Sequence, residues 1–270
     1  MPELPEVETV VRGLVPVLTG TRIQSLVVRR PDLRWPVPED LETRLRGARV
    51  LAVRRRAKFG LLDTDRGDTL IFHLGMSGRF RLDPAEVLAH DHVLLQAGGR
   101  RLAFHDPRRF GSIHLVQSRA AHLHPLLAQL GPEPLSEAFD GDTLARAAAG
   151  RQAPIRALLL DQRVVAGLGN IYVAEALFRA RVNPMRRAGG IARGRLDRIA
   201  ESVKQVLAEA IAAGGSSLRD HVGVGGTLGT FQHHFQVYGR SGAPCPACGA
   251  PIRRETVAGR SSFACKRCQR

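Results

Sequence analysis

Hydrophobic residues recur at helical spacing near the start of the chain. Between residues 5 and 18, the apolar side chains that keep this spacing are Val7, Val10, Val11, Leu14 and Leu18. The pattern predicts an amphipathic helix with one buried face. Pro5 suits the first turn of such a helix, because its missing N–H would have no partner there. Glu3 and Glu6 then lie near the positive end of the helix.

From about residue 20 to residue 117 the pattern changes to short segments typical of strands. Turn-forming stretches such as residues 65–68 and 97–99 separate them. The expected strands cover residues 22–29, 49–55, 60–64, 69–74, 92–96, 101–105 and 112–116. Many short strands favour a β-sandwich or barrel-like pair of sheets, with the first helix packed against it. The next stretch, Gly131–Pro134, indicates an interdomain linker.

Beyond this linker the apolar spacing is helical again. The expected helices cover residues 143–149, 155–162, 171–179 and 193–213, and Gly214 and Gly215 end the last one. Residues 216–236 are rich in Gly, Ser and Thr, so we expect a short helix followed by a mobile loop. The chain is therefore predicted to be an α+β protein. Its domains are an N-terminal β-sandwich over residues 1–130, a helical domain over residues 131–236 and a cysteine-bearing segment over residues 237–270.

Composition and charge exclude some classes of protein and favour one kind of binding partner. With 270 residues, 44% of them hydrophobic, the chain can bury a core, but no apolar run approaches the roughly 20 residues that span a bilayer. The first residues carry acids where a signal peptide carries bases, so we expect a soluble, cytoplasmic protein. Only three of the 40 basic residues are lysines, and the net charge of +15 favours a polyanion such as nucleic acid. An arginine-rich composition that only aids solubility is the alternative.

The four cysteines form two pairs near the C-terminus. Their order is Cys245-x2-Cys248-x16-Cys265-x2-Cys268. Two such pairs supply the four thiolates of a closed, structural zinc site, and the residues between them alternate well enough for a β-hairpin. Two disulfides are the alternative, which an intracellular location disfavours. Because the hairpin is basic, it suits a DNA backbone, although a protein-binding knob is also possible.

The region between residues 153 and 183 reads as two helices joined by a glycine-containing turn. Asn170 is expected to cap the second helix through its side chain. A helix N-terminus that follows Gly-x-Gly offers free N–H groups to a phosphate. An ordinary helical hairpin is the alternative interpretation, and the basic zinc hairpin shifts the balance toward DNA.

The N-terminus itself is a candidate nucleophile. Removal of Met1 is expected before a small residue such as Pro2, and it would leave a secondary amine with a pKa of roughly 8. Attack of this amine on a sugar carbon gives an iminium, which favours elimination. Glu3 would act as the proton shuttle. The alternative is that Pro2 and Pro5 only begin a helix.

Ordered motifs along the whole chain resemble the formamidopyrimidine-DNA glycosylase family. The similar segments are residues 1–14 (MPELPEVETVVRGL), 56–59, 73–78, 106–111, 130–135, 169–172, 236–240 and the four cysteines. The resemblance implies a β-sandwich domain flanked by helices, followed by a helix–two-turn–helix domain with a zinc finger. It also implies a bifunctional DNA glycosylase/AP lyase of base excision repair that removes oxidised purines such as 8-oxoguanine. Its expected partner is damaged double-stranded DNA, bound by a monomer with one structural zinc and no membrane.

The resemblance also implies roles for individual residues. Pro2 would form the Schiff base, Glu3 would act as acid and base, and Glu6 would support them. Lys58 would bind the phosphate near the lesion. Three side chains would fill the gap left by the extruded base: Met76, Arg109 and Phe110. Four would contact phosphates on either side of it: His73, Asn170, Tyr238 and Arg260. The stretch of residues 216–236 corresponds to the loop that closes over the flipped base.

The chain departs from the family at Arg156, where many relatives have lysine, which puts a catalytic role at this position in doubt. Two alternatives remain. One is an endonuclease VIII-type glycosylase for oxidised pyrimidines, which Leu4 argues against because those sequences typically carry glycine there. The other is a catalytically silent DNA-binding paralogue. The bacterial enzyme implied by the resemblance would work in the cytoplasm, at the nucleoid.

Overall fold

The computed structural model describes residues 2–217 and 223–270. Its chain divides into two compact units. Unit 1 comprises Met1–Ala128 and Ala213–Thr230, and unit 2 comprises Gln129–Ala212 and Phe231–Arg270. The three-domain division stays a prediction. Among the described helices, none is long and apolar enough to cross a membrane.

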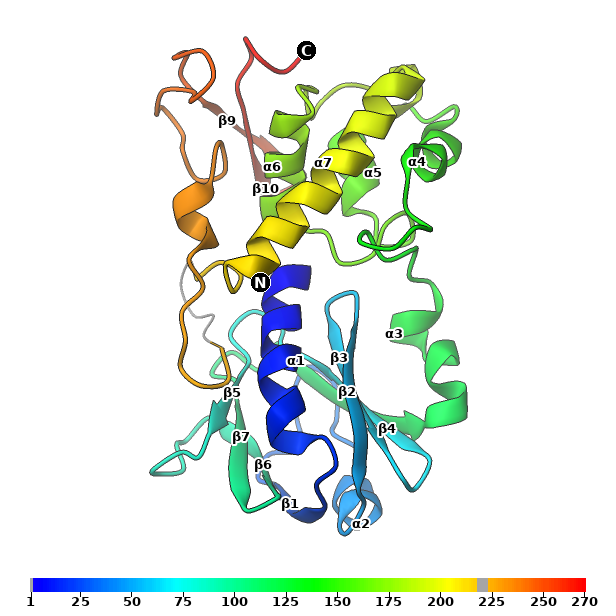
Figure 1. The fold of residues 1–270 in the computed structure, drawn as a ribbon, viewed down its shortest axis with the longest axis vertical. Helices are drawn as coiled ribbons and strands as arrows, with labels where there is room; N and C mark the ends of the chain where they lie inside the picture. The colour runs from blue at the N-terminus through cyan, green and yellow to red at the C-terminus, as the bar shows by residue number, and fades with distance from the viewer. Residues whose placement is uncertain (1, 218–222) are drawn as a thin grey trace. The chain divides into compact units, whose positions relative to one another are not determined.

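Unit 1 is built around two four-stranded antiparallel sheets (Figure 1). The first has the order β1-β6-β7-β5, with bounds β1 (Ile23–Val28), β6 (Asp91–Ala97), β7 (Arg100–His105) and β5 (Arg79–Leu82). The second has the order β2-β3-β4-β8, with bounds β2 (Val50–Arg56), β3 (Phe59–Thr64), β4 (Asp68–His73) and β8 (Ser112–Gln117). The predicted pair of sheets is confirmed. The sequence pattern missed β5, whose four residues Arg-Phe-Arg-Leu give too short an alternation.

One hydrophobic core joins the two sheets and helix α1 (Leu4–Leu18). The buried face of α1 is the predicted one, with Val7, Val10 and Leu14 inside this core. The Phe80 ring of β5 lies 4.9 Å from the Phe72 ring of β4 and 5.3 Å from the Phe104 ring of β7. The Phe80–Phe104 contact lies within the first sheet, and the Phe80–Phe72 contact joins that sheet to the second, so the two sheets pack face to face as in a sandwich.

Three short helices of unit 1 were not expected: α2 (Leu41–Leu45), η1 (Ser118–Leu123) and α3 (Pro125–Ala128). Each is too short for its apolar spacing to stand out from a loop. They lie among the strands in sequence and connect or follow them.

The chain returns to unit 1 at residues 213–230. Val224 is 5% exposed and belongs to the unit 1 core. It packs on Gly13 so closely that a Cβ there would lie 3.1 Å from the Val224 Cβ. Ser216 pairs with Thr230 in a β-bridge. The described helical turn of residues 216–236 is η3 (Phe231–His234), near their end. The short helix expected at their start stays a prediction, because it falls on residues that the structure does not describe. Residues 218–222 of the expected mobile loop lie outside the described residues.

Unit 2 is mainly helical, as predicted. Its elements are α4 (Gly141–Ala148), α5 (Ile155–Leu160), α6 (Asn170–Arg179), η2 (Ala188–Gly190), α7 (Arg193–Ala212), η3 and the hairpin of β9 (Arg253–Val257) and β10 (Arg260–Ala264). The hairpin shares a small core with α6, because Phe178 packs with Ile252 and Phe263. The expected linker is held within unit 2, since the Gly131 N–H donates to the Gln162 carbonyl at 2.8 Å.

Candidate active site and metal centre

The N-terminus of α1 gathers two buried carboxylates. Glu3 is 3% exposed and Glu6 is 2% exposed. The backbone N–H of Glu3 donates to Glu6 Oε2 at 2.8 Å, and the two residues form a capping box. Glu6 Oε1 accepts from the N–H and the hydroxyl of Ser216 at 2.8 and 2.9 Å. Pro2, also buried, therefore precedes a firmly held pair of acids. Residue 1 lies outside the described residues, so removal of Met1 stays a prediction.

Lys58 and His73 lie at the same end of neighbouring strands. Phe59, which follows Lys58, pairs with His73 in the β3–β4 ladder, and their rings are 4.9 Å apart. The Gly75 N–H donates to His73 Nδ1 at 3.0 Å. Burial, reinforced by the Lys58 cation, lowers the pKa of His73 to about 4. His73 is therefore neutral at pH 7 with its proton on Nε2, which can donate to an anion.

An ion pair that sequence reasoning missed ties the Lys58 turn to α1. Arg55 Nε donates to Glu8 Oε2 at 2.8 Å, and its Nη1 donates to the Ala57 carbonyl at 3.0 Å. Burial alone would raise the pKa of Glu8, but hydrogen bonds from Arg55 and Arg12 lower it below its usual value. The turn that carries Lys58 is thus fixed to the helix that begins beside Pro2.

Met76 and Phe110 project from two turns that touch. Met76 is 39% exposed and Phe110 is 42% exposed, which is unusual for large apolar side chains. Gly75 has φ +63°, and a Cβ on it would lie 2.3 Å from the Phe110 carbonyl carbon. Only glycine fits this contact. The structure therefore brings together two residues that the resemblance assigns to one task.

Asp106 holds these two turns together and was not identified from the sequence. It is fully buried, its Oδ1 accepts from the Ser77 hydroxyl at 2.6 Å and its Oδ2 accepts from the Gly111 N–H at 2.8 Å. Its carbonyl pairs with His92 Nε2 at 2.8 Å. In the sequence, Asp106 could have been identified by its position at the start of the motif that contains Arg109 and Phe110.

Arg109 adopts a left-handed backbone conformation with φ +55°. Its Nη1 donates to Asp32 Oδ2 at 2.7 Å. Arg30 also donates to Asp32, and the Arg30 hydrogen bond followed by the Arg109 charge holds the Asp32 pKa below its usual value. Both partners of the Arg109–Asp32 pair are about half exposed, so it is a weak contact that another ligand can replace.

In unit 2 the Asn170 side chain does not cap α6, contrary to the expectation. The N-cap is Gly169, and Asn170 is the first helical residue. Its Oδ1 accepts from Arg156 Nη2 at 2.6 Å, and its Nδ2 donates to the Ser261 carbonyl at 2.8 Å. Asn170 thus connects α5 with β10, the strand that begins at Arg260.

Glu175 organises the backbone around Tyr238. This buried carboxylate of α6 accepts from the N–H groups of Gln236, Val237 and Tyr238 at 2.9, 3.0 and 2.8 Å. Burial raises its pKa, although the three N–H groups oppose the rise. The Tyr238 ring packs 5.2 Å from Phe263 of the hairpin. Sequence reasoning missed Glu175, because its partners lie far away along the chain.

The four cysteine sulfurs meet at the base of the hairpin. Every pair of these sulfurs lies within 4.8 Å, and the cysteines are not disulfide-bonded. The Ala250 N–H lowers the pKa of Cys248 to about 7, whereas the Cys248 thiol raises that of Cys268 to about 12. Four converging sulfurs that compete for protons fit one tetrahedral zinc ion with no open position.

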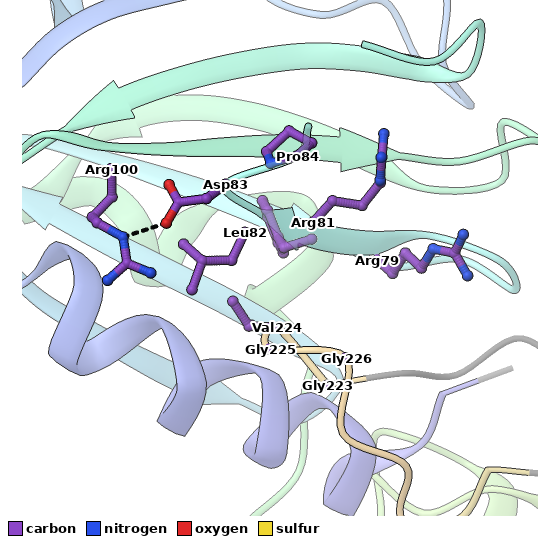
Figure 2. A pocket seen from close by; sticks show the side chains of 11 residues that line it. Arg79, Arg81, Leu82, Asp83, Pro84, Arg100, Gly223, Val224, Gly225 and Gly226 are labelled. Atoms are coloured by element: carbon purple, nitrogen blue, oxygen red, sulfur yellow. Dashed lines mark hydrogen bonds and ion pairs between the residues drawn. The ribbon is translucent and has the colours of Figure 1, made fainter. Parts of the chain in front are cut away.

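A cavity of about 430 Å³ separates β5 from the turn of residues 223–226 in unit 1 (Figure 2). Leu82 and Val224 face each other across it, and Arg100 pairs with Asp83 at one side. Arg79 and Arg81 line the other side. The cavity is basic, and its lining includes a described part of the stretch that resembles the family's closing loop.

Three family models match the chain. Residues 1–113 match the formamidopyrimidine-DNA glycosylase N-terminal domain, residues 130–222 match its H2TH domain, and residues 242–270 match the zinc finger found in FPG and IleRS. Together they define a DNA glycosylase architecture with a zinc finger.

Curated relatives and solved structures agree with these models. Formamidopyrimidine-DNA glycosylases of Rhizorhabdus wittichii and Sphingopyxis alaskensis are 55% and 54% identical, with 100% of each chain covered. The crystal structure of MutM (Fpg) from Thermus thermophilus is 45% identical, has a TM-score of 0.90, and the match covers 99% of this chain and 98% of that one. Lactococcus lactis Fpg bound to DNA containing an abasic site is 34% identical, with a TM-score of 0.92 and full coverage of both. The chain belongs to the formamidopyrimidine-DNA glycosylase family.

Proposed function

We propose that this protein is a bifunctional DNA glycosylase/AP lyase of base excision repair, which excises oxidised purines such as 8-oxoguanine and formamidopyrimidines and then cuts the strand. The observation that carries the proposal is the buried group at the start of α1. There Pro2 precedes Glu3 and Glu6, whose carboxylates are held by a capping box and by Ser216. A secondary amine beside buried carboxylates is the chemistry that Schiff-base catalysis needs.

In the proposed reaction the Pro2 nitrogen attacks C1′ of the damaged nucleoside. The N-glycosidic bond breaks, and its electron pair leaves with the base, which gains a proton. Opening of the sugar gives an iminium between Pro2 and C1′, and Glu3 exchanges the protons. Loss of the C2′ proton expels the 3′ phosphate, loss of the C4′ proton expels the 5′ phosphate, and water then releases Pro2.

The remaining site residues would hold the DNA in the shape that this reaction requires. Extruding a base costs a few kcal/mol of stacking, which Met76 and Phe110 would partly replace in the duplex. Arg109 would hydrogen-bond to the opposite base. The proposed phosphate ligands are Lys58, His73, Asn170, Tyr238 and Arg260. Zinc on Cys245, Cys248, Cys265 and Cys268 would supply folding free energy to the hairpin and no catalytic group.

This substrate also implies a location. Chromosomal DNA is the damaged duplex available in a bacterium, so we infer that the protein works in the cytoplasm, at the nucleoid. Duplex DNA in turn accounts for the basic excess of the chain, since neutralising phosphates releases counterions and drives binding.

Borohydride trapping tests the proposal. The processed protein is mixed with a duplex that contains 8-oxoguanine, and borohydride reduces the iminium to a stable covalent adduct. We expect an adduct with the wild type, none with Pro2→Gly, and an adduct with the matched control Pro5→Ala, whose nitrogen lies in a peptide bond. Trapping only on oxidised pyrimidines would indicate an endonuclease VIII-type enzyme, and binding without any adduct would indicate a silent paralogue.

A further inference from the structure

Arg156 carries a buried positive charge in unit 2. It is 6% exposed, and its Nη2 donates to Asn170 Oδ1 at 2.6 Å. Within residues 2–217 and 223–270, no carboxylate pairs with Arg156 or with Arg260. Burial and the nearby Arg260 guanidinium both lower the pKa of Arg156. Two neighbouring cations without an acid between them are unfavourable, and an anion would stabilise them.

The Asn170 carboxamide is engaged at both of its ends. Its oxygen accepts from Arg156, and its Nδ2 donates to the carbonyl of Ser261, the residue after Arg260. The carboxamide therefore connects α5, the first turn of α6 and β10 through two hydrogen bonds. Because its side chain is occupied in this way, Asn170 can meet a phosphate with its backbone N–H at the positive end of α6.

We propose that Arg156 is a positioning residue for DNA binding. It fixes the Asn170 carboxamide, which in turn fixes the β10 backbone beside Arg260, so that the α6 N-terminus and the Arg260 guanidinium bind one phosphodiester group. The inference rests on the proposed function, since it requires that unit 2 binds DNA. Lysine, which many relatives carry at this position, can also donate to the Asn170 oxygen, and the planar guanidinium of Arg156 only directs that donor more rigidly.

A double-mutant cycle on the full-length, zinc-loaded protein tests this inference. Affinity is measured for a duplex with a tetrahydrofuran abasic analogue, using Arg156→Gln, Asn170→Ala and the double variant. Each single change is expected to weaken binding by roughly tenfold, the scale of one hydrogen bond to a charged group. The double variant is expected to lose no more than about twice the loss of Asn170→Ala alone, because Arg156 acts through Asn170.

Further variants separate positioning from general destabilisation. Arg156→Lys keeps the charge and one donor and is expected to recover affinity to within about threefold of the wild type. Arg163→Gln is the matched control, because Arg163, just after α5, is exposed and pairs with Asp161 alone among the described acids. The affinity of this variant is expected to stay unchanged. Zinc content and the unfolding midpoint are measured for every variant, and affinities are compared well below that midpoint.

Multiplicative losses in the double variant, roughly 100-fold, would overturn the inference, since Arg156 would then act independently of Asn170. An unchanged affinity of Arg156→Gln would also overturn it. Both results are obtained with a wild type that binds and traps lesion DNA. They are therefore distinct from a failure of the proposed function, in which the wild type itself would neither bind nor trap.

Discussion

The Ser77 hydroxyl donates to the Asp106 carboxylate at 2.6 Å and thereby joins the turn that carries Met76 to the turn that carries Arg109 and Phe110. Asp106 is fully buried, so its Oδ1 would lose this partner in Ser77→Ala. Loss of a buried hydrogen bond costs about 1–3 kcal/mol.

For Ser77→Ala we therefore expect a lower free energy of unfolding in urea and a slower single-turnover excision of 8-oxoguanine, by about tenfold. Ser25→Ala is the control, because the hydrogen bond of the Ser25 hydroxyl to Gln96 is exposed and, at 3.5 Å, long. If Ser77→Ala excised 8-oxoguanine at the wild-type rate, excision would not depend on the hydrogen bond between these two turns.

Arg109→Ala should weaken discrimination between opposite bases more than it weakens binding in general. A directed guanidinium contact to a base discriminates by about 1–3 kcal/mol, so the ratio of excision rates opposite C and A should change by about tenfold or more. Arg30→Ala is a matched control, since Arg30 pairs with the same Asp32 carboxylate. Equal losses on every duplex would contradict a role in reading the opposite base.

His73 should remain neutral until the pH falls far below its ordinary pKa. In the folded protein the pKa is about 4, lowered by burial from 6.5. The unfolded chain therefore binds the proton first as the pH falls. The contribution of neutral His73 to the free energy of unfolding is therefore complete above about pH 6.5. It falls by a few kcal/mol as the pH falls toward 4.

The measurement is urea unfolding at pH 7 and pH 5 for the wild type and for His73→Gln, which cannot titrate. We expect a smaller pH dependence in the variant. The difference isolates His73 from His114, whose pKa burial also lowers to about 4. An identical pH dependence in the two proteins would contradict the assignment.

Removing the metal should abolish DNA binding while unit 1 stays folded. The hairpin shares only a small core with α6, so four uncoordinated thiols should leave it unable to present Arg260. After chelation we expect affinity for lesion DNA to fall by at least about 100-fold. Fluorescence of Trp35, the single tryptophan and a residue of unit 1, reports whether that unit remains folded. Unchanged affinity would exclude a role for the zinc hairpin.

The parts that the sequence predicted well are local in the chain. The apolar period of α1 and the spacing of the four cysteines each lie within a short segment, so a pattern suffices to identify them. The expected cap at Asn170 was wrong because the side chain found stronger partners in Arg156 and Ser261. The preference of Asn for a helix cap is a local property, and it cannot reveal a hydrogen bond to Ser261, which lies 91 residues away in the sequence.

Asp106 and Glu175 were missed for the same physical reason. From the sequence alone, an acidic residue is expected to be a solvated charge. Only the folded chain shows that Asp106 accepts a hydrogen bond from Ser77 and that Glu175 accepts from the N–H groups of residues 236–238. Strand β5 was missed because its partner β7 stabilises a segment whose own pattern is weak.

Because unit 1 is built from two separate stretches of the chain, the ribosome completes it late in synthesis. Val224, which packs on Gly13, and Ser216, which binds Glu6, are translated only after all of α7. A nascent chain that ends before residue 213 contains all the strands of both sheets, yet its Glu6 carboxylate lacks the two hydrogen bonds that Ser216 donates. During synthesis, Glu6 thus gains its Ser216 donors only after residues 129–212 of unit 2 have also been made.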